Sequence, residues 1–111
     1  MIGLGFNVGL TKNKIMKLHQ LKTEFGSQIT EIAKRRNIEN IRVFGSVARG
    51  DSGEKSDVDF LVHLCPQASL LDLSGFNLDL QDLLRCKVDV LSDNSIHHSI
   101  REKIFAEVVS L

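Results

Sequence analysis

Hydrophobic positions in the first third of the chain recur every three or four residues between Lys14 and about Asn37. This spacing places them along one face of an amphipathic helix, and they are Ile15, Leu18, Leu21, Phe25, Ile29, Ile32 and Ala33. Three basic residues follow at 34–36, where cations favour the last turn of a helix. The pattern therefore predicts one long helix that ends near Asn37.

Three short apolar segments farther along the chain have the composition and alternation of β-strands. They cover residues 41–44, 57–64 and 88–91. The first is followed by Gly45, and a single helical turn is expected directly after it. The second is closed by Pro66, which cannot continue a strand ladder.

Two more segments have helical spacing, one over 69–85 and one that starts at Asn94 or Ser95. Ser69 and Asp72 fit a capping box at the start of the earlier helix, with Asp in place of the usual Glu. Since strands alternate with helices, the sequence predicts a small α/β domain, a mixed sheet of about three to four strands flanked by helices. A helical crossover would make the second and third strands parallel.

At 111 residues the chain is long enough for one hydrophobic core and too short for two. The domain is expected over residues 14–111, and residues 1–13 as a flexible extension or an added edge strand. The apolar run Met1–Leu10 lacks the positive region and cleavage site of a signal peptide. No segment resembles a membrane span, so a cytoplasmic protein without a membrane partner is expected.

The formal net charge is zero, with 14 basic and 14 acidic residues. This balance argues against a general nucleic-acid binder, which usually has a positive surplus. The charges are distributed unevenly, because residues 1–50 hold nine Lys or Arg and three Glu, whereas 51–111 hold five basic and eleven acidic residues. That asymmetry suits an anionic ligand bound near metal-holding carboxylates, and equally a charge-complementary protein partner.

Asp57 and Asp59 open the second strand and are two residues apart. Alternate strand residues share a face, so these side chains point the same way, about 6.6 Å apart along the backbone. Two such carboxylates can converge on a pair of metal ions about 4 Å apart. Asp89 interrupts the apolar third strand, where an unpaired charge would be costly. It is the third candidate metal ligand.

Gly45 and Ser46 form the turn after the first strand. Glycine lets the backbone approach a ligand closely, and Ser46 offers a hydroxyl and a backbone N–H to phosphate. Arg49 lies one turn farther and could pair with a departing pyrophosphate. Together with the aspartates, this turn predicts a site that takes ATP with divalent metal.

Three motifs in this order resemble the nucleotidyltransferase superfamily that includes polymerase beta, and within it the minimal nucleotidyltransferase (MNT) antitoxin family. They are Gly45-Ser46-x-x-Arg49-Gly50, Ser56-Asp57-x-Asp59, and Asp89. The resemblance extends from about Lys14 to Val109. It implies that Asp57, Asp59 and Asp89 are catalytic and bind two Mg²⁺ ions, and that ATP is the substrate. It also implies a HEPN-type ribonuclease toxin as partner, silenced when AMP is transferred to one of its tyrosines.

Each of these residues also has a structural interpretation. Asp57 and Asp59 could form a solvated strand start, and Asp89 could cap a loop at a strand end. Ser46 could simply cap the short helix, although that geometry also serves phosphate binding. Arg49 could be an ordinary surface charge.

The leading hypothesis is therefore a cytoplasmic, magnesium-dependent nucleotidyltransferase, a protein adenylyltransferase that acts as an antitoxin. One alternative is a non-catalytic binding module that neutralises the toxin sterically. Another is a transferase that modifies a small molecule, such as an antibiotic hydroxyl, which would need oligomerisation to build an acceptor pocket.

Overall fold

The structure is a computed structural model that describes residues 17–51 and 57–111. The expected extension at 1–13 and the motif residue Ser56 lie outside the described residues. In chain order the elements are α2 (Leu18–Glu24), α3 (Gly26–Arg35), β1 (Ile38–Phe44), α4 (Gly45–Arg49), β2 (Val58–Leu64), α5 (Leu70–Leu84), β3 (Val88–Ser92), α6 (His98–Glu107) and β4 (Val109–Ser110).

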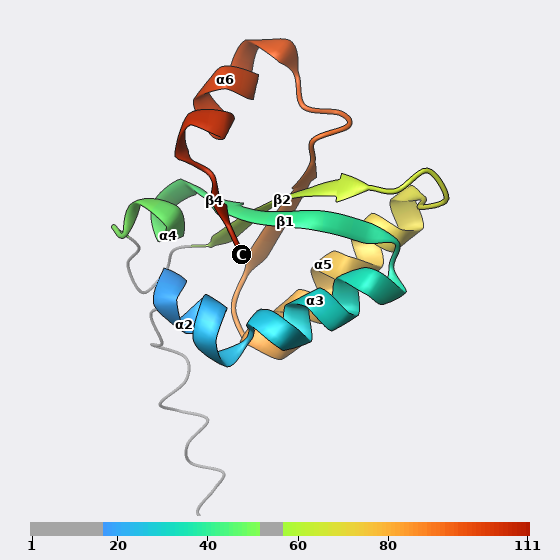
Figure 1. Ribbon diagram of the computed structural model, residues 1–111, viewed down its shortest axis with the longest axis horizontal. Helices are drawn as coiled ribbons and strands as arrows, with labels where there is room; N and C mark the ends of the chain where they lie inside the picture. The colour runs from blue at the N-terminus through green and yellow to red at the C-terminus, as the bar shows by residue number, and fades with distance from the viewer. Residues whose placement is uncertain (1–16, 52–56) are drawn as a thin grey trace, which may run out of the picture.

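The four strands form one mixed sheet in the order β3-β2-β1-β4. Strand β1 pairs antiparallel with β2 and with β4, whereas β2 and β3 are parallel. Helices α3 and α5 lie together beneath one face of the sheet, and α6 lies on the other side (Figure 1). The predicted α/β fold with a mixed sheet is confirmed, including the parallel arrangement of β2 and β3.

The core lies between the sheet and the helices α3 and α5. Alternate residues of β2, namely Val58, Phe60 and Val62, are fully buried there. Their helical neighbours in the same cluster are Ile29, Ile32, Phe76, Leu80 and Leu84. Because strand side chains alternate, the residues between them belong to the opposite face. We call this opposite side of the sheet the open face.

The predicted single helix at the start of the domain is wrong, because two helices occupy this stretch. Phe25 leaves the helical ladder at φ −117° and ψ −6°, and α3 begins at Gly26. Glycine is a weak helix former, so the break occurs where propagation is least favourable. Leu21 on α2 and Ile29 on α3 are both fully buried. The predicted stop at Asn37 is confirmed, because that residue takes a left-handed φ of 59°.

The starts of the last two long helices differ in how well the sequence predicted them. The capping box of α5 is present, and the Ser69 N–H donates to Asp72 Oδ2 at 3.0 Å. Helix α6, by contrast, is capped by His97, whose Nδ1 accepts from the Ser99 N–H at 3.1 Å. The predicted cap at Asn94 or Ser95 is wrong, because the Asn94 side chain instead accepts a hydrogen bond from the backbone at the end of β2. Within the described ranges, no helix has the length and apolar character needed to cross a membrane.

Candidate active site

Asp59 and Asp89 are direct neighbours across the parallel strands β2 and β3. Adjacent strands lie about 4.8 Å apart, and paired residues of parallel strands point to the same face. Both carboxylates therefore lie on the open face. Asp57 directly precedes β2, close enough for its charge to act on Asp59. The fold thus brings the three predicted aspartates to one end of the open face.

The electrostatics of Asp59 reflect this crowding. The pKa of Asp59 is raised to about 6, mainly by burial and also by the negative charges of Asp89 and Asp57. Arg49 acts in the opposite direction, whereas Glu107 adds to the repulsion. A partly buried carboxylate beside two others is unfavourable unless a cation accompanies it. The arrangement therefore favours binding of a positive ion.

The chemistry of these donors fits Mg²⁺. Magnesium prefers oxygen ligands and is usually held by one or two carboxylates, with waters and substrate phosphates completing its octahedron. Across residues 17–51 and 57–111, no group of three His, Cys, Asp or Glu side chains forms a complete metal-binding site by itself. Asp57 Oδ2 lies 3.7 Å from the Nζ of Lys87. Because the Lys87 side chain is mostly exposed, this ion pair is weak and leaves Asp57 able to bind a metal ion. The donor set therefore suits an ion held jointly by the protein and a nucleotide.

Gly45 packs directly against Asp59, because the residue before it, Phe44, is the register partner of Asp59. The φ of Gly45 is 76°, and a Cβ atom there would collide with Asp59 Oδ2. Glycine is therefore favoured both by the backbone conformation and by the space available. The predicted phosphate-binding turn and the predicted metal ligand form one structural unit.

The turn continues as the single helical turn α4, which carries Ser46 and Arg49. The Arg49 Nε donates to Asp51 Oδ2 at 3.2 Å, and Nη1 lies 3.3 and 3.2 Å from the two oxygens of Glu107. Hydrogen bonds to Asp51 and Glu107 raise the pKa of Arg49 above its ordinary value. Arg49 thus lies at the predicted site with two acidic partners.

Glu107 is part of this site although the sequence did not point to it. It lies at the end of α6, 58 residues from Arg49 along the chain. Besides Arg49, its Oε1 accepts a hydrogen bond from the Gly45 N–H at 3.2 Å. No local motif surrounds this glutamate, so only the fold reveals its position.

A family model described as the nucleotidyltransferase domain matches residues 27–111, which include all of these groups. The chain belongs to the nucleotidyltransferase domain family. It is therefore an enzyme of the class that transfers a nucleotide.

Two relatives extend this comparison. "Putative protein adenylyltransferase MJ0435" of Methanocaldococcus jannaschii is 36% identical over 88 residues, covering 79% of this chain and 95% of the relative. "Protein adenylyltransferase MntA" of Thermococcus cleftensis is 32% identical over 95 residues, covering 86% of this chain and 96% of the relative. This nucleotidyltransferase therefore matches both relatives over nearly their whole length.

Solved structures share the fold. A structure described as a putative minimal nucleotidyltransferase superposes with a TM-score of 0.76 at 34% identity, covering 86% of this chain and 97% of the other. A toxin–antitoxin structure with AMP-PNP has a TM-score of 0.67 at 17% identity, covering 78% of this chain and 71% of the other. The second similarity extends to the fold alone.

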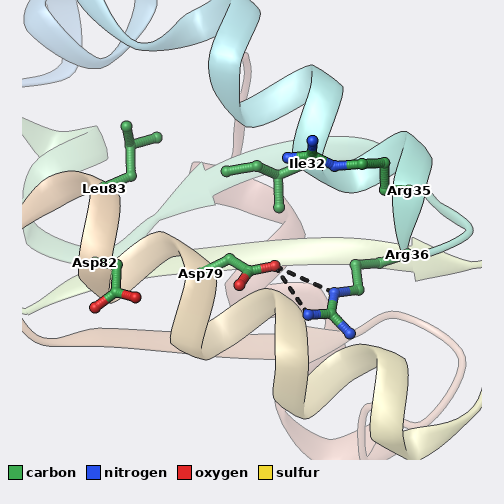
Figure 2. Close-up of a pocket in the computed structure, with 6 residues that line it drawn as sticks. All are labelled: Ile32, Arg35, Arg36, Asp79, Asp82 and Leu83. Atoms are coloured by element: carbon green, nitrogen blue, oxygen red, sulfur yellow. Dashed lines mark hydrogen bonds and ion pairs between the residues drawn. The ribbon is translucent and has the colours of Figure 1, made fainter.

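A hollow of about 590 Å³ lies elsewhere in this nucleotidyltransferase, between α3 and α5 (Figure 2). Its lining residues are Ile32, Arg35, Arg36, Asp79, Asp82 and Leu83. Arg36 reaches across it to Asp79, with Nη2 3.1 Å from Oδ2. None of the predicted site residues lines this hollow, so it is separate from the candidate active site.

A second charged cluster lies on the open face beside α6. Asp93, just after β3, accepts hydrogen bonds from Arg42 Nη2 at 2.6 Å and from the His63 Nδ1 at 2.7 Å. Arg42 also lies over the ring of Phe105 on α6, 5.5 Å from its centroid. The cluster joins β1, β2 and the chain after β3 to α6, which indicates a structural role in the nucleotidyltransferase.

Asp93→Asn is expected to lower the free energy of unfolding by about 1–3 kcal/mol at pH 7. Burial alone would raise the pKa of Asp93, but hydrogen bonds from Arg42 and His63 outweigh it and lower the pKa below its ordinary value. A lowered folded pKa gives stability above the unfolded value, near 3.9, and this contribution is lost as the pH falls through the folded pKa. The difference between the two proteins should therefore shrink below about pH 4.

Urea unfolding at pH 7 and at pH 3.5 measures this effect. Asp82→Asn serves as a matched control, because Asp82 is an exposed aspartate on α5, and it is expected to leave the stability unchanged. If Asp93→Asn lowers the free energy of unfolding equally at both pH values, the stabilising interaction of the Asp93 charge with Arg42 and His63 is contradicted.

Proposed function

We propose that this nucleotidyltransferase transfers AMP from ATP to a tyrosine hydroxyl of a HEPN-type toxin, and that it acts as the antitoxin of that toxin in the cytoplasm. The contact between the Gly45 turn and Asp59, with Asp89 beside it, carries the proposal. In that contact, a turn with the chemistry to bind phosphate lies against a carboxylate with the chemistry to bind metal, which supports the proposal.

The names of similar proteins support the choice of reaction and partner. The two relatives above are named protein adenylyltransferases. A solved complex with the same fold is described as a tri-AMPylated Shewanella oneidensis HEPN toxin in complex with MNT antitoxin. The proposal extends that reaction and that kind of partner to this chain.

In the proposed mechanism, Asp57, Asp59 and Asp89 would hold Mg²⁺, which would supply charge neutralisation for the triphosphate. Ser46 and the Gly45 turn orient the phosphates, and Arg49 stabilises the negative charge of the pyrophosphate. The tyrosine oxygen forms a bond to the α-phosphorus while the bond from that phosphorus to the pyrophosphate oxygen breaks. Asp89 accepts the proton of the attacking hydroxyl. Positioning and charge stabilisation account for the catalysis.

The surface of α5 supports a macromolecular partner. Leu70, Leu71 and Leu78 are 75%, 82% and 63% exposed. Large apolar side chains that remain exposed in this way are suited to burial against another protein. Since such a contact would form with or without catalysis, a non-catalytic antitoxin is the second candidate.

Intact mass spectrometry of the protein with its toxin, ATP and Mg²⁺ tests the proposal. We expect the toxin mass to rise by whole AMP units with the wild-type protein. A matched reaction with Asp57→Asn/Asp59→Asn should give no increase, because the variant lacks two metal ligands. Peptide mapping of the modified toxin should place the AMP on tyrosine.

Two results would change the conclusion. An unmodified toxin that still binds tightly and loses its ribonuclease activity would favour the non-catalytic antitoxin. AMP transfer to a small hydroxylated acceptor, with no transfer to the toxin, would favour the small-molecule transferase.

A further inference from the structure

Glu107 contacts both groups that are proposed to bind the phosphates, namely the Gly45 turn and the Arg49 guanidinium. Its Oε1 accepts a hydrogen bond from the Gly45 N–H at 3.2 Å, and both oxygens lie within 3.3 Å of Arg49 Nη1. The Glu107 side chain is 25% exposed, whereas that of Arg49 is 49% exposed. One carboxylate thus contacts the backbone of the turn and the cation that follows it.

Among the described residues 17–51 and 57–111, the acidic partners of Arg49 contact two of its three guanidinium nitrogens. Asp51 accepts from Nε at 3.2 Å, and Glu107 accepts from Nη1. A planar guanidinium carries five N–H donors in a fixed arrangement. It can therefore be held through Nε and Nη1 while Nη2 is directed at an anion.

Glu107 is itself held in place from both sides along the chain. Two residues earlier, Phe105 lies beneath Arg42, which is fixed by Asp93. Two residues after it, β4 begins at Val109 and pairs with β1 at Arg42 and Val43. The position of the Glu107 carboxylate is therefore set by the sheet and not by a free helix end.

We infer that Glu107 is a positioning residue for nucleotide binding, which holds the Gly45 turn and the Arg49 guanidinium in the arrangement that receives the β- and γ-phosphates of ATP. The inference rests on the proposed function, which supplies the nucleotide. An arginine that is already ordered loses less side-chain entropy when it binds a phosphate. The Glu107 carboxylate also adds a negative charge to the site, which by itself would disfavour ATP. We nevertheless expect removal of this carboxylate to weaken ATP binding, because Arg49 and the Gly45 turn would lose their order.

The test compares Glu107→Ala, Glu107→Gln and wild type by calorimetric binding of ATP with Mg²⁺ and by the kinetics of AMP transfer. Glu107→Ala is expected to weaken ATP binding and raise KM for ATP by about tenfold, as the loss of charge-assisted hydrogen bonds would. The value of kcat should change less than KM. Glu107→Gln keeps an oxygen for the Gly45 N–H, so a smaller loss is expected. Glu102→Ala, an exposed glutamate on the same helix, is the matched control and should behave as wild type.

Two further measurements separate positioning from general damage. The affinity for inorganic tripolyphosphate should fall together with that for ATP, whereas the affinity for AMP, which lacks the β- and γ-phosphates, should not change. In an Arg49→Ala background, Glu107→Ala should weaken ATP binding by much less than it does alone, because the residue it positions is already gone.

Three outcomes would overturn the inference. Tighter ATP binding by Glu107→Ala would mean that the carboxylate competes with phosphate, and unchanged binding would mean that it has no influence. Equal losses for AMP and tripolyphosphate would indicate a general structural defect. If the wild-type protein transfers AMP and Glu107→Ala binds ATP as the wild type does, this inference alone is rejected. If the variants show the expected ATP-binding pattern but the wild-type protein transfers no AMP, the proposed function alone is rejected.

Discussion

Asp59→Asn is expected to lower kcat/KM for AMP transfer by about 10³-fold or more and, at the same time, to stabilise the metal-free protein at pH 7. The loss of activity follows from the removal of a charge that is proposed to hold Mg²⁺, at the centre of the three aspartates. The gain in stability follows from the surroundings of the same carboxylate. Burial and the neighbouring Asp89 and Asp57 raise the pKa of Asp59 to about 6.

The direction of this effect depends on pH. The pKa of Asp59 is higher in the folded protein than the value near 3.9 of an unfolded chain. Between these values the folded state binds more protons, so the contribution to stability is present below about pH 4 and is lost as the pH rises through 6. Solvent screening of a partly exposed group reduces the effect to about 1 kcal/mol. The stability gained by Asp59→Asn should therefore be near zero at pH 4 and about 1 kcal/mol at pH 7.

Urea unfolding in EDTA at pH 4, 5.5 and 7, together with AMP transfer in Mg²⁺, measures both parts of this prediction. The variant Asp82→Asn, which removes an exposed carboxylate of α5, is the control for a change of net charge. A less stable Asp59→Asn protein at pH 7 would refute the proposed repulsion. Residual AMP transfer near the wild-type rate would refute the role of Asp59.

Gly45→Ala is expected to lower AMP transfer by about 100-fold, since a displacement of about 1 Å at a catalytic group can cost that much. The new Cβ would collide with Asp59 Oδ2, so the carboxylate or the turn must move. The left-handed φ of 76° adds backbone strain. Together these effects should lower the free energy of unfolding by about 1–3 kcal/mol.

Gly50→Ala is a matched control within the same motif. Gly50 has a similar φ of 82°, but a Cβ there would meet no heavy atom within 4 Å. It should show the loss of about 1–2 kcal/mol that comes from backbone strain, while keeping most of the activity. Equal activity losses in the two variants would contradict the argument that Gly45 acts through Asp59.

Local patterns were sufficient to predict most of the elements and the convergence of the three aspartates. Alternation along β2 indicated that Asp57 and Asp59 share a face, and a helical crossover predicted that β2 and β3 are parallel. The structure adds the register, in which Asp59 pairs directly with Asp89. Register depends on packing across the sheet, which no single segment of the sequence contains.

The features that the sequence did not predict depend on competition between alternative local structures or on contacts between residues far apart in the chain. Helical spacing continues through Phe25 and Gly26, so the pattern alone did not reveal that the chain bends there. Strand β4 has only two residues and shows no period. Asn94 resembles a helix cap, but its side chain has a better partner in the backbone of Leu64. Glu107 contacts Gly45 from 62 residues away.

The pairing of Asp59 with Asp89 also affects which sheet can form during folding. A shift of β3 by one residue along β2 would turn Asp89 toward the helical layer and move Val88 out of it. An unpaired carboxylate in that apolar layer would cost several kcal/mol. The two charges cost about 1 kcal/mol in the correct alignment and much more in the shifted one. The acidic residues proposed to bind metal therefore also widen the energy gap between the native sheet and its nearest misaligned competitor.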